Sequence, residues 1–505
     1  MSNPLYDRLF RPHEGKTTPF LRFLDGSEMP YQDFLSLVSR LAHVLTEKGL
    51  VPGDRVAVQV HKSPQALALY GAAVKAGLVF LPLNTAYTAH EITYFVEDSG
   101  AQILICDSGN METYQSLFAD HDIEILSLNA DGSGTVIDQA LMMKADFQTA
   151  PREKDDLVAI LYTSGTTGRS KGAMLTQNNL LSNALSLVDA WRFSEEDILL
   201  HALPIFHTHG LFVATNIILA TSGSILFLPK FDLDAIMTLM PKATAMMGVP
   251  TFYTRMLEDQ RLTREMTAHI RLFISGSAPL LAESHKQFLA RTGHAILERY
   301  GMTETNMNTS NPYDGERRPG TVGFPLPGVE LNITDPEHGT ILPQGEVGQI
   351  ELRGPNVFKG YWQMPEKTAA ELRPDGFFIT GDLGRLDADG YLHIVGRNKD
   401  LIISGGYNIY PKEIELILDD QPGVLESAVL GVPHPDLGET VLGVIVASPG
   451  QNPNLDHIAA AAGSALARFK QPRKLILIDA LPRNTMGKVQ KNILREHFKD
   501  IFLDG

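Results

Sequence analysis

Short apolar runs alternate with segments of helical period along the N-terminal part of the chain. The runs rich in Val, Ile, Leu and Phe indicate β-strands, and they lie at residues 55–60, 78–83, 101–106, 157–163, 223–229 and 270–275. Several are apolar on both faces, which is typical of parallel strands covered by helices. Apolar positions repeat with helical spacing over residues 31–50 and 62–77. The alternation predicts an α/β fold with helices on both faces of a sheet.

The pattern changes near Gly320, where Gly, Pro and short alternating runs replace the helical segments. Residues 320–354 are therefore predicted to form mostly antiparallel β structure. A second change follows residues 396–400. Beyond it the pattern indicates a hairpin, helices from about 412 and near 455–468, and strands at 427–433, 442–447 and 474–479. We place the domain boundary here. A large N-terminal domain of layered α/β subdomains plus a β-rich subdomain covers residues 1–396, and a small α+β domain covers residues 397–505.

One stretch, Gly210 to Leu228, carries no charge and is about long enough to cross a bilayer. Thr, Asn, Ser and Gly residues interrupt it, so we interpret it as a buried helix, a turn and a strand. The N-terminus has neither the apolar region nor the small-residue cleavage site of a signal peptide. We therefore expect a cytoplasmic protein that does not bind membranes.

Composition narrows the possible functions further. The chain has 505 residues, 44% of them apolar and 20% charged, which suits a large core in two or more domains. Its 59 acidic residues outnumber the 43 Lys and Arg residues, and the net charge of −16 argues against nucleic acids as partners. The single cysteine, Cys106, excludes an internal disulfide and a cysteine-rich metal site. We interpret Cys106 as a small apolar residue in a buried strand.

A loop rich in glycine and hydroxyl groups follows the predicted strand that ends at Tyr162. Glycines let backbone N–H groups approach a phosphate, hydroxyls add donors, and basic side chains supply positive charge. The residues with these properties are Thr163, Ser164, Gly165, Thr166, Thr167, Gly168, Arg169, Ser170, Lys171 and Gly172. The loop is not a Walker A motif, and no G-x-G-x-x-G follows a strand, so a nicotinamide-dependent dehydrogenase is disfavoured.

This loop and four later motifs resemble those of the adenylate-forming superfamily, which contains acyl-CoA synthetases, luciferases and the adenylation domains of peptide synthetases. The motifs occur in the family's order, at residues 163–172, 300–304, 380–382, 396–413 and 482–488. The resemblance extends from about residue 30 to 495. It implies that a carboxylic acid is activated with ATP and Mg²⁺ as an acyl-adenylate. It also implies that the C-terminal domain is mobile, and we expect a stand-alone CoA ligase.

The resemblance assigns roles to residues of these motifs. Adenylation brings a carboxylate against the α-phosphate, so cations and positioning must supply most of the catalysis. Lys488 is the expected catalytic cation, Glu304 the Mg²⁺ ligand, and His207 lies near the carboxylate and the CoA channel. The other positions carried over are Tyr300 and Thr303 at the nucleotide, Asp382 and Arg397 at the ribose, Lys399 at the hinge, and Ser404, Gly405 and Gly406 along the CoA channel.

The acyl substrate is expected to bind between the phosphate loop and residues 300–304. Arg255 lies in an otherwise apolar stretch and is suited to a second carboxylate; its alternative is a surface residue that pairs with Glu258 or Asp259. Arg299 is a second candidate cation. The pair His207 and His209 lacks the further ligands of a metal site.

The segments around Arg255, Arg299 and Lys488 resemble those of malonyl-CoA synthetases. There Arg255 would hold the distal carboxylate, with Ser277 and Arg299 as further contacts. The sequence thus predicts a malonate–CoA ligase whose partners are malonate, ATP and CoA. Two alternatives stay open: a ligase for methylmalonate or a short monocarboxylate, and a non-catalytic nucleotide-binding protein.

Overall fold

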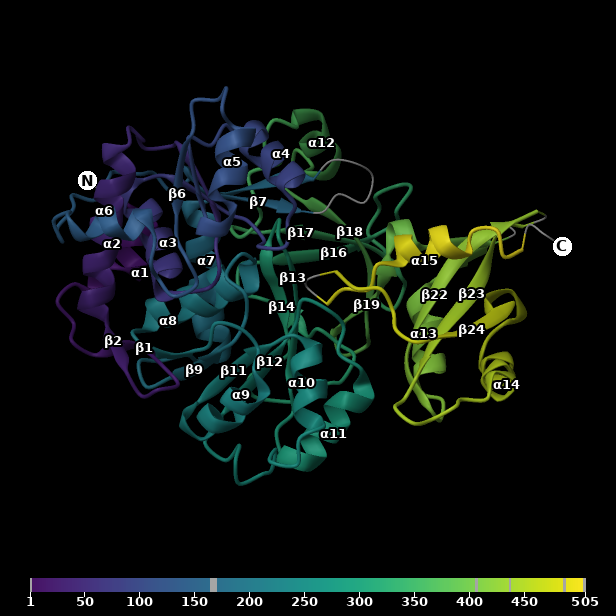
Figure 1. Cartoon of the computed structure of the whole chain (residues 1–505). Coiled ribbons are helices and arrows are strands. Elements are labelled where there is room, and N and C mark those ends of the chain that lie inside the picture. Colours follow the sequence, from purple (N-terminus) through teal and green to yellow (C-terminus); the bar gives the residue numbers. More distant parts are fainter. Residues whose placement is uncertain (1, 164–169, 405–406, 436, 485–486, 503–505) are drawn as a thin grey trace. The chain divides into compact units, whose positions relative to one another are not determined.

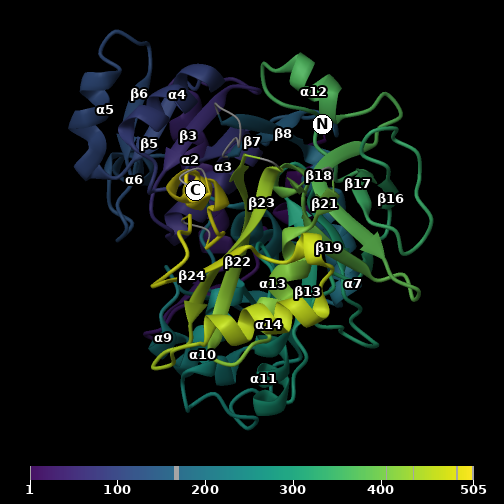
Figure 2. The same cartoon turned by 90° about the vertical axis from the view of Figure 1, so that its right-hand side faces the viewer.

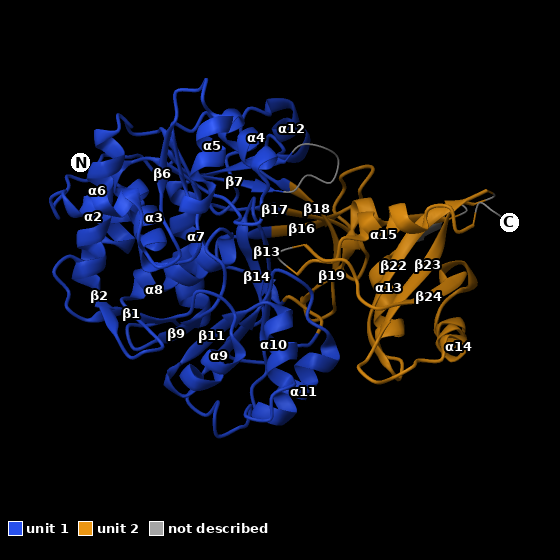
Figure 3. Cartoon of the chain, viewed as in Figure 1, with its two compact units in different colours: residues 1–319, 323–330, 352–378 blue, residues 320–322, 331–351, 379–505 orange. Residues whose placement is uncertain are grey.

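The computed structural model (Figure 1, with a second view in Figure 2) describes residues 2–163, 170–404, 407–435, 437–484 and 487–502. The chain divides into two compact units (Figure 3). The first comprises residues 1–319, 323–330 and 352–378, and the second residues 320–322, 331–351 and 379–505. The domain boundary expected between residues 396 and 397 stays a prediction.

The first unit contains a six-stranded sheet in the order β6-β5-β3-β4-β7-β8. Its strands run parallel except for β8, which is antiparallel to β7. The strand bounds are β3 Arg55–Gln59, β4 Val79–Pro82, β5 Ile103–Cys106, β6 Glu124–Ser127, β7 Leu157–Thr163 and β8 Lys171–Thr176. The four predicted strands in this region are confirmed. Cys106 is fully buried in β5, as expected.

A nine-stranded sheet in the order β15-β14-β13-β12-β11-β9-β10-β1-β2 completes the first unit's β structure. Its central strands are parallel, and antiparallel pairs occupy both edges. The bounds are β1 Pro19–Arg22, β2 Glu28–Pro30, β9 Ile198–His201, β10 Ser224–Phe227, β11 Ala245–Gly248, β12 Leu272–Ser275, β13 Leu297–Met302, β14 Asn306–Ser310 and β15 Phe324–Pro325.

Helices cover these sheets on both faces, which explains why so many strands are apolar throughout. One continuous core joins both sheets through α2, α3, α7 and α8, and α4 and α5 cover the opposite face of the six-stranded sheet. The helices are α1 Pro4–Leu9, α2 Tyr31–Glu47, α3 Pro64–Ala76, α4 Ala89–Ser99, α5 Met111–Leu117, α6 Thr135–Leu141, α7 Gln177–Trp191, α8 Asn216–Thr221, α9 Leu233–Leu239, α10 Pro250–Leu257, α11 Ala282–Thr292 and α12 Pro365–Glu371.

Local sequence sets the ends of α3. The Ser63 side chain accepts a hydrogen bond from the backbone of Ala66, and Pro64 occupies the first helical position. The helix stops at Gly77, whose φ of 73° is left-handed. The uncharged stretch from Gly210 to Leu228 forms a buried π-helical turn, α8 and β10, as expected.

A four-stranded sheet in the order β16-β17-β18-β19 follows residue 320. Its strands are β16 Glu330–Thr334, β17 Gly348–Arg353, β18 Phe378–Leu386 and β19 Leu392–Arg397. Strands β18 and β19 are antiparallel, in line with the antiparallel structure expected in this part of the chain.

The C-terminal part is an α+β structure around a five-stranded sheet, whose strands β22, β23 and β24 can be followed in Figure 2. Helices α13 and α14 pack on one face of the sheet and α15 on the other. The bounds are β20 Ile402–Ser404, β21 Tyr407–Ile409, α13 Pro411–Asp419, β22 Val424–His434, β23 Gly438–Ala447, α14 Leu455–Ala465, β24 Lys474–Ile478 and α15 Lys491–Phe498. No helix within the described ranges combines the length and apolar character needed to cross a membrane.

Candidate active site

The phosphate loop connects two paired strands of the six-stranded sheet. Strand β7 ends at Thr163 and β8 begins at Lys171, and these two residues are partners in the antiparallel register. The Thr163 hydroxyl donates to the Lys171 carbonyl at 3.4 Å, and the Tyr94 hydroxyl donates to the carbonyl of Ser170 at 2.8 Å. The sheet thus places both ends of the loop side by side. The predicted residues Ser164, Gly165, Thr166, Thr167 and Gly168 lie outside the described residues.

A network of charged and phenolic groups surrounds Lys171. Its ammonium group lies 3.5 Å from a Glu371 oxygen and 4.1 Å from the centre of the Tyr361 ring. The Tyr361 hydroxyl is 2.6 Å from Glu371 and 3.0 Å from Glu304. Lys367 lies 2.6 Å from the other Glu371 oxygen. The first unit therefore joins the loop's lysine to the predicted metal ligand through two residues that sequence reasoning missed.

Strand pairing brings Tyr361 to this position. The backbone of residues 359–362 pairs with β8 through Lys359 N to Met174 O, Met174 N to Gly360 O, and Trp362 N to Gly172 O. A β-carbon at Gly172 would lie 2.8 Å from the Ile160 side chain and 3.3 Å from Trp362, so glycine permits the close approach. The aromatic pair that follows Gly360 was the only signal in the sequence, and it does not name a partner.

The Glu304 carboxylate is chemically suited to bind Mg²⁺, but one side chain is not a complete metal site. Glu304 is 6% exposed, and its carboxylate supplies the hard oxygen donors that Mg²⁺ prefers. Residues 2–163, 170–404, 407–435, 437–484 and 487–502 contain no group of three or more His, Cys, Asp or Glu side chains that could hold a metal. This fits an ion that is bound by one or two carboxylates and the phosphates of a nucleotide. The neighbouring Tyr300 and Thr303 are half-buried.

Arg299 is the most deeply buried cation of the predicted acyl region. It is 4% exposed, and its Nε and Nη2 atoms have no hydrogen-bond partner among the described residues. Burial lowers the pKa of its guanidinium group. A β-carbon at Gly276 would lie 2.4 Å from the guanidinium carbon, so only glycine leaves room here. The next residue, Ser277, has a φ of 70°, a strained conformation of the kind found at ligand sites.

Two buried histidines extend this group. The Ser277 hydroxyl lies 3.3 Å from His209 Nδ1, and burial, followed by the charge of Arg299, lowers the pKa of His209. The backbone N–H of His209 donates to His207 Nδ1 at 3.3 Å. Nδ1 of His207 is therefore an acceptor, which places the proton of a neutral His207 ring on Nε2.

A buried lysine contacts another histidine of the same unit. Lys62 lies 3.0 Å from His201 Nδ1 and 2.8 Å from the His201 carbonyl. His201 Nε2 lies 2.9 Å from the Gly210 carbonyl, to which it must donate, so Nδ1 accepts from Lys62. Burial lowers the pKa of both side chains.

Arg255 differs from Arg299 in its surroundings. Its side chain is exposed on α10, with the guanidinium carbon 5.5 Å from the centre of the Phe231 ring. Phe231 in turn packs against Phe252 at 4.4 Å. Both rings line a cavity of about 270 Å³ that also includes Phe206, the residue before His207. The role of Arg255 at a second carboxylate stays a prediction.

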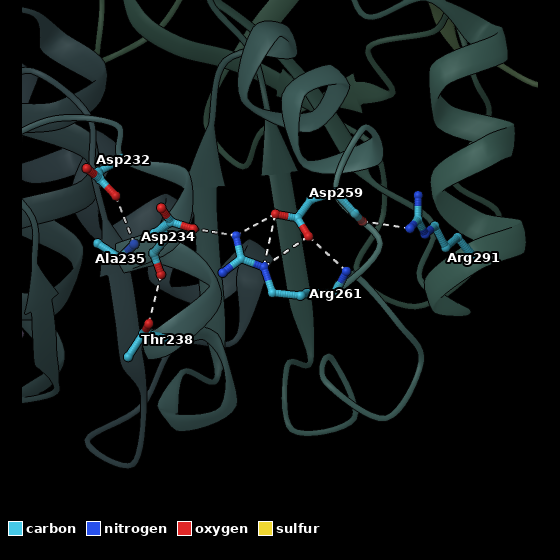
Figure 4. A network of polar contacts seen from close by, with 7 residues as sticks. All are labelled: Asp232, Asp234, Ala235, Thr238, Asp259, Arg261 and Arg291. Atoms are coloured by element: carbon cyan, nitrogen blue, oxygen red, sulfur yellow. Dashed lines mark hydrogen bonds and ion pairs between the residues drawn. The ribbon is translucent and has the colours of Figure 1, made fainter.

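A polar network lies directly after α10, and Figure 4 shows its contacts among Asp234, Asp259, Arg261 and Arg291. Arg261 lies 2.6 Å from both Asp259 and Asp234, which links the segment after α10 to α9. Arg291 of α11 donates to the carbonyls of Leu257, Asp259 and Leu262. These contacts orient the helix that carries Arg255.

In the second unit, Asp382 and Arg397 form a close pair. They are register partners in β18 and β19, and Arg397 Nε lies 2.8 Å from an Asp382 oxygen. Asp382 is 4% exposed, whereas the Arg397 side chain is 41% exposed. Gln349 donates to the Asp382 carbonyl, and the Asp382 N–H donates to the Thr380 hydroxyl. The pair presents a carboxylate and a donor together, which is what two ribose hydroxyls need.

The remaining predicted residues of the second unit lie in short segments. Lys399 is in a 3-10 turn, Asn398–Asp400, directly after β19, and burial lowers its pKa. Ser404 ends β20 and is buried. Gly405 and Gly406 lie outside the described residues. Lys488 is exposed, and its backbone N–H donates to the Asn484 side chain at 3.0 Å.

Comparison with known families is decisive at this point. The profile of the AMP-binding enzyme family matches residues 12–362, and that of the AMP-binding enzyme C-terminal domain matches residues 413–488. The chain belongs to the AMP-binding enzyme family. The adenylate-forming fold expected from the five motifs is therefore confirmed.

Relatives within the family are named for different carboxylic acids. The ATP-bound structure of MatB from Rhodopseudomonas palustris is 56% identical, covers 99% of this chain and 100% of its own, and has a TM-score of 0.97. The malonate–CoA ligase of Arabidopsis thaliana is 34% identical over 90% of this chain and 79% of its own. A feruloyl-CoA synthase of Amycolatopsis is 35% identical over 94% of both chains.

Proposed function

We propose that this protein is a malonate–CoA ligase. It would convert malonate and ATP to malonyl-AMP and pyrophosphate, and then malonyl-AMP and CoA to malonyl-CoA and AMP. The observation that carries the choice of acid is Arg299, a buried guanidinium group with unpartnered donors beside Ser277. A monocarboxylate would leave that charge buried without a counter-ion, which is costly, whereas the distal carboxylate of malonate would pair with it.

Two groups of residues are proposed to contact the nucleotide, one at its phosphates and one at its ribose. Backbone N–H groups of residues 163–171 and the Lys171 ammonium group are suited to the phosphates. The Asp382 carboxylate accepts hydrogen bonds from the ribose hydroxyls, and the Arg397 guanidinium group donates hydrogen bonds to them. Glu304 is the proposed Mg²⁺ ligand, and the bound ion would neutralise part of the phosphate charge.

In the first half-reaction, a malonate oxygen attacks the α-phosphorus. A new P–O bond forms as the bond to the β-phosphate breaks, and pyrophosphate leaves. Lys488 is proposed to neutralise charge on the attacking carboxylate and the α-phosphate, where two anions must meet. Arg299 and Ser277 orient the other carboxylate, with Arg255 as the further predicted contact. His207 is proposed to lie beside the reacting carboxylate.

In the second half-reaction, the thiol of CoA replaces AMP. The C–S bond forms as the acyl–phosphate bond breaks, and the thiol proton is released. We propose that the segment around Lys399 changes conformation between the two half-reactions, and that Ser404, Gly405 and Gly406 then line the path of the pantetheine arm. Glycines suit that role because a backbone without β-carbons can approach a narrow ligand closely.

The test is substrate-dependent release of pyrophosphate from ATP and Mg²⁺. Malonate, methylmalonate, acetate and an eight-carbon acid are offered separately, and the CoA thioester is then measured for each acid that responds. The proposal expects malonate to give the highest kcat/KM in both assays. Preference for acetate or the longer acid would contradict the assignment of the acid, and ATP binding without pyrophosphate release on any acid would support the non-catalytic alternative.

A further inference from the structure

We propose that Glu415 is a positioning residue for adenylation. It holds Lys491, the residue directly after the lysine loop (residues 482–490), and so fixes the direction in which that loop presents Lys488. Both Glu415 and Lys491 act through Lys488, so the proposal rests on the role proposed for Lys488 in the first half-reaction. It names two residues of the second unit that have no part in that reaction as proposed above.

The lysine loop is closed by hydrogen bonds of its own. The N–H of Gln490 donates to the Pro482 carbonyl at 2.8 Å, and the Asn484 N–H donates to the Lys488 carbonyl at 2.9 Å. The backbone N–H of Lys488 donates in turn to the Asn484 side chain at 3.0 Å. These bonds tie the two arms of the loop to each other. The direction of Lys488 is therefore set where the arms join the rest of the second unit.

Ion pairs hold both ends of the lysine loop. At its start, Arg483 pairs with Glu426 of β22. At its end, Lys491 is the first residue of α15, and its ammonium group lies 2.5 Å from Glu415 Oε1. The same oxygen accepts the N–H of Val429 in β22 at 3.1 Å. Because β22 is an edge strand of the five-stranded sheet, α13 and α15 reach one carboxylate at this edge from opposite faces.

The Glu415 carboxylate is buried and stays charged. The side chains of Glu415 and Lys491 are 8% and 19% exposed. Burial alone would raise the pKa of Glu415, but Lys491 and then Lys412, 3.6 Å from the other oxygen, hold it below its usual range. A buried ion pair is often no more stabilising than apolar residues of the same volume, because both charges lose water. The consequence that we infer is geometric, since the carboxylate fixes the place of an ammonium group three residues after Lys488.

The two half-reactions should respond differently when this anchor is lost. Lys488 must meet two anions at once in adenylation, and a displacement of about 1 Å in a positioned group can cost about 10²-fold in rate. Thioester formation does not use Lys488 in the proposed reaction, so a displaced loop should leave it unchanged. Unfolding of the second unit would slow both half-reactions, because the residues proposed for the CoA path belong to the same unit.

The experiment measures the two half-reactions separately on the full-length protein. One assay follows pyrophosphate release from malonate and ATP, and the other follows AMP release from supplied malonyl-AMP and CoA. Lys491→Met keeps an unbranched side chain and removes its charge. We expect kcat for pyrophosphate release to fall about ten-fold or more, with AMP release within about two-fold of wild type. Lys491→Arg, whose charge can still pair with Glu415, should recover most of the loss.

Lys470→Met is the matched control. Lys470 also pairs with a carboxylate of α13, that of Glu413 at 2.8 Å, and its side chain is 25% exposed. It lies in the turn Arg468–Lys470, outside the lysine loop, so its loss should leave both half-reactions as in the wild type.

A double variant protects the test against loss of the fold. Glu415→Gln/Lys491→Met removes both charges, so neither is left buried without its partner, and amide hydrogen exchange of β22 should match the wild type. The double variant should show the same selective loss as Lys491→Met, because the two residues act as one unit.

Two results would overturn the positioning role: equal losses in both half-reactions of a folded variant, or wild-type pyrophosphate release in the double variant. The second result decides the matter if Lys491→Met does not fold. Failure of the proposed function gives a different outcome. A wild type that prefers another acid contradicts the choice of malonate, and the same variants are then assayed with that acid. Lys488→Ala with full pyrophosphate release would contradict the role of Lys488 itself, and a wild type that activates no acid would overturn the function and the positioning role together.

Discussion

Two arginines of the first unit lie in opposite environments, and they are expected to contribute differently to selectivity. Arg299 is buried with unpartnered donors, whereas Arg255 is exposed and rests on an aromatic ring. A buried charge that lacks a partner destabilises the free protein and favours a ligand that supplies the counter-ion. An exposed guanidinium group attracts an anion more weakly because water already solvates it.

Arg299→Met should abolish the preference for malonate without harming the fold. A broken buried pair costs about 3–5 kcal/mol, which corresponds to a loss of roughly 10² to several times 10³ in kcat/KM for malonate. Butyrate should lose much less. Because the wild-type donors lack partners, the variant should melt at the same temperature as the wild type or higher. The measurement is the malonate-to-butyrate ratio of kcat/KM together with a melting curve; an unchanged ratio would remove the main support for a dicarboxylate substrate.

Arg255→Ala should lower the same malonate-to-butyrate ratio, because the segment around it predicts contact with the distal carboxylate. Because Arg255 is exposed in this structure, we expect a smaller effect than at Arg299, about two- to five-fold, or up to about 1 kcal/mol. Arg264→Ala, a change at another arginine of the first unit, is a suitable control. If Arg255→Ala leaves the ratio within experimental error, Arg255 is a surface residue and Arg299 carries the selectivity alone.

At the scale of elements, α13 ends in an unfavourable charge. Asp419 is the last residue of the helix, where the partial negative charge of the helix end opposes a carboxylate. Burial raises its pKa to about 6, and Glu415 adds to the effect, although Lys412 and a hydrogen bond from Ser427 oppose it. The folded state thus binds a proton more tightly than the unfolded state, whose value is near 3.8.

Asp419→Asn should therefore stabilise the second unit at neutral pH. For an acid with a raised pKa, stability is greatest below the unfolded value and falls as pH rises to the folded value. The shift from 3.8 to about 6 corresponds to about 3 kcal/mol, present as a gain for the variant above pH 6 and absent near pH 4. Amide hydrogen exchange of β22 and β23, compared between wild type and variant at each pH, measures this difference in stability. A variant that is less stable at pH 7.5 would mean that attraction to Lys412 outweighs burial.

At the scale of the whole molecule, the two half-reactions are proposed to need two conformations of the segment after β19. Lys399→Pro should then impair thioester formation more than adenylation. Proline fixes φ near −65° and removes an N–H, so it restricts a segment that must adopt two backbone states. We expect pyrophosphate release within a few-fold of wild type and a loss of thioester yield of ten-fold or more, about 1.4 kcal/mol in barrier height. Lys144→Ala, far from Lys399 in sequence, serves as the control. Equal losses in both assays would contradict a pivot at Lys399.

Local patterns in the sequence determined the elements and the family. Continuous apolar runs were sufficient to locate β3, β4, β5 and β7, since a strand covered on both faces needs little beyond apolar β-forming residues. The caps of α3 are set by nearby residues, because capping depends on residues within one turn. The motif order led to the adenylate-forming superfamily, which the family match confirms. Strands β9, β11 and β13 were not predicted, although β4 and β5 are as short, because each of the three contains His, Gly or charged residues and none is a continuous run of β-forming residues.

Only the tertiary structure decided which side chains face each other. Tyr361 and Glu304 are 57 positions apart, and they meet because the chain after β17 returns to pair with β8. The burial of Arg299 depends on the order of strands in the nine-stranded sheet and on the missing β-carbon of Gly276. The physical reason is one of range. Helix and strand preferences act over a few residues, whereas the environment of a charge depends on every segment packed around it.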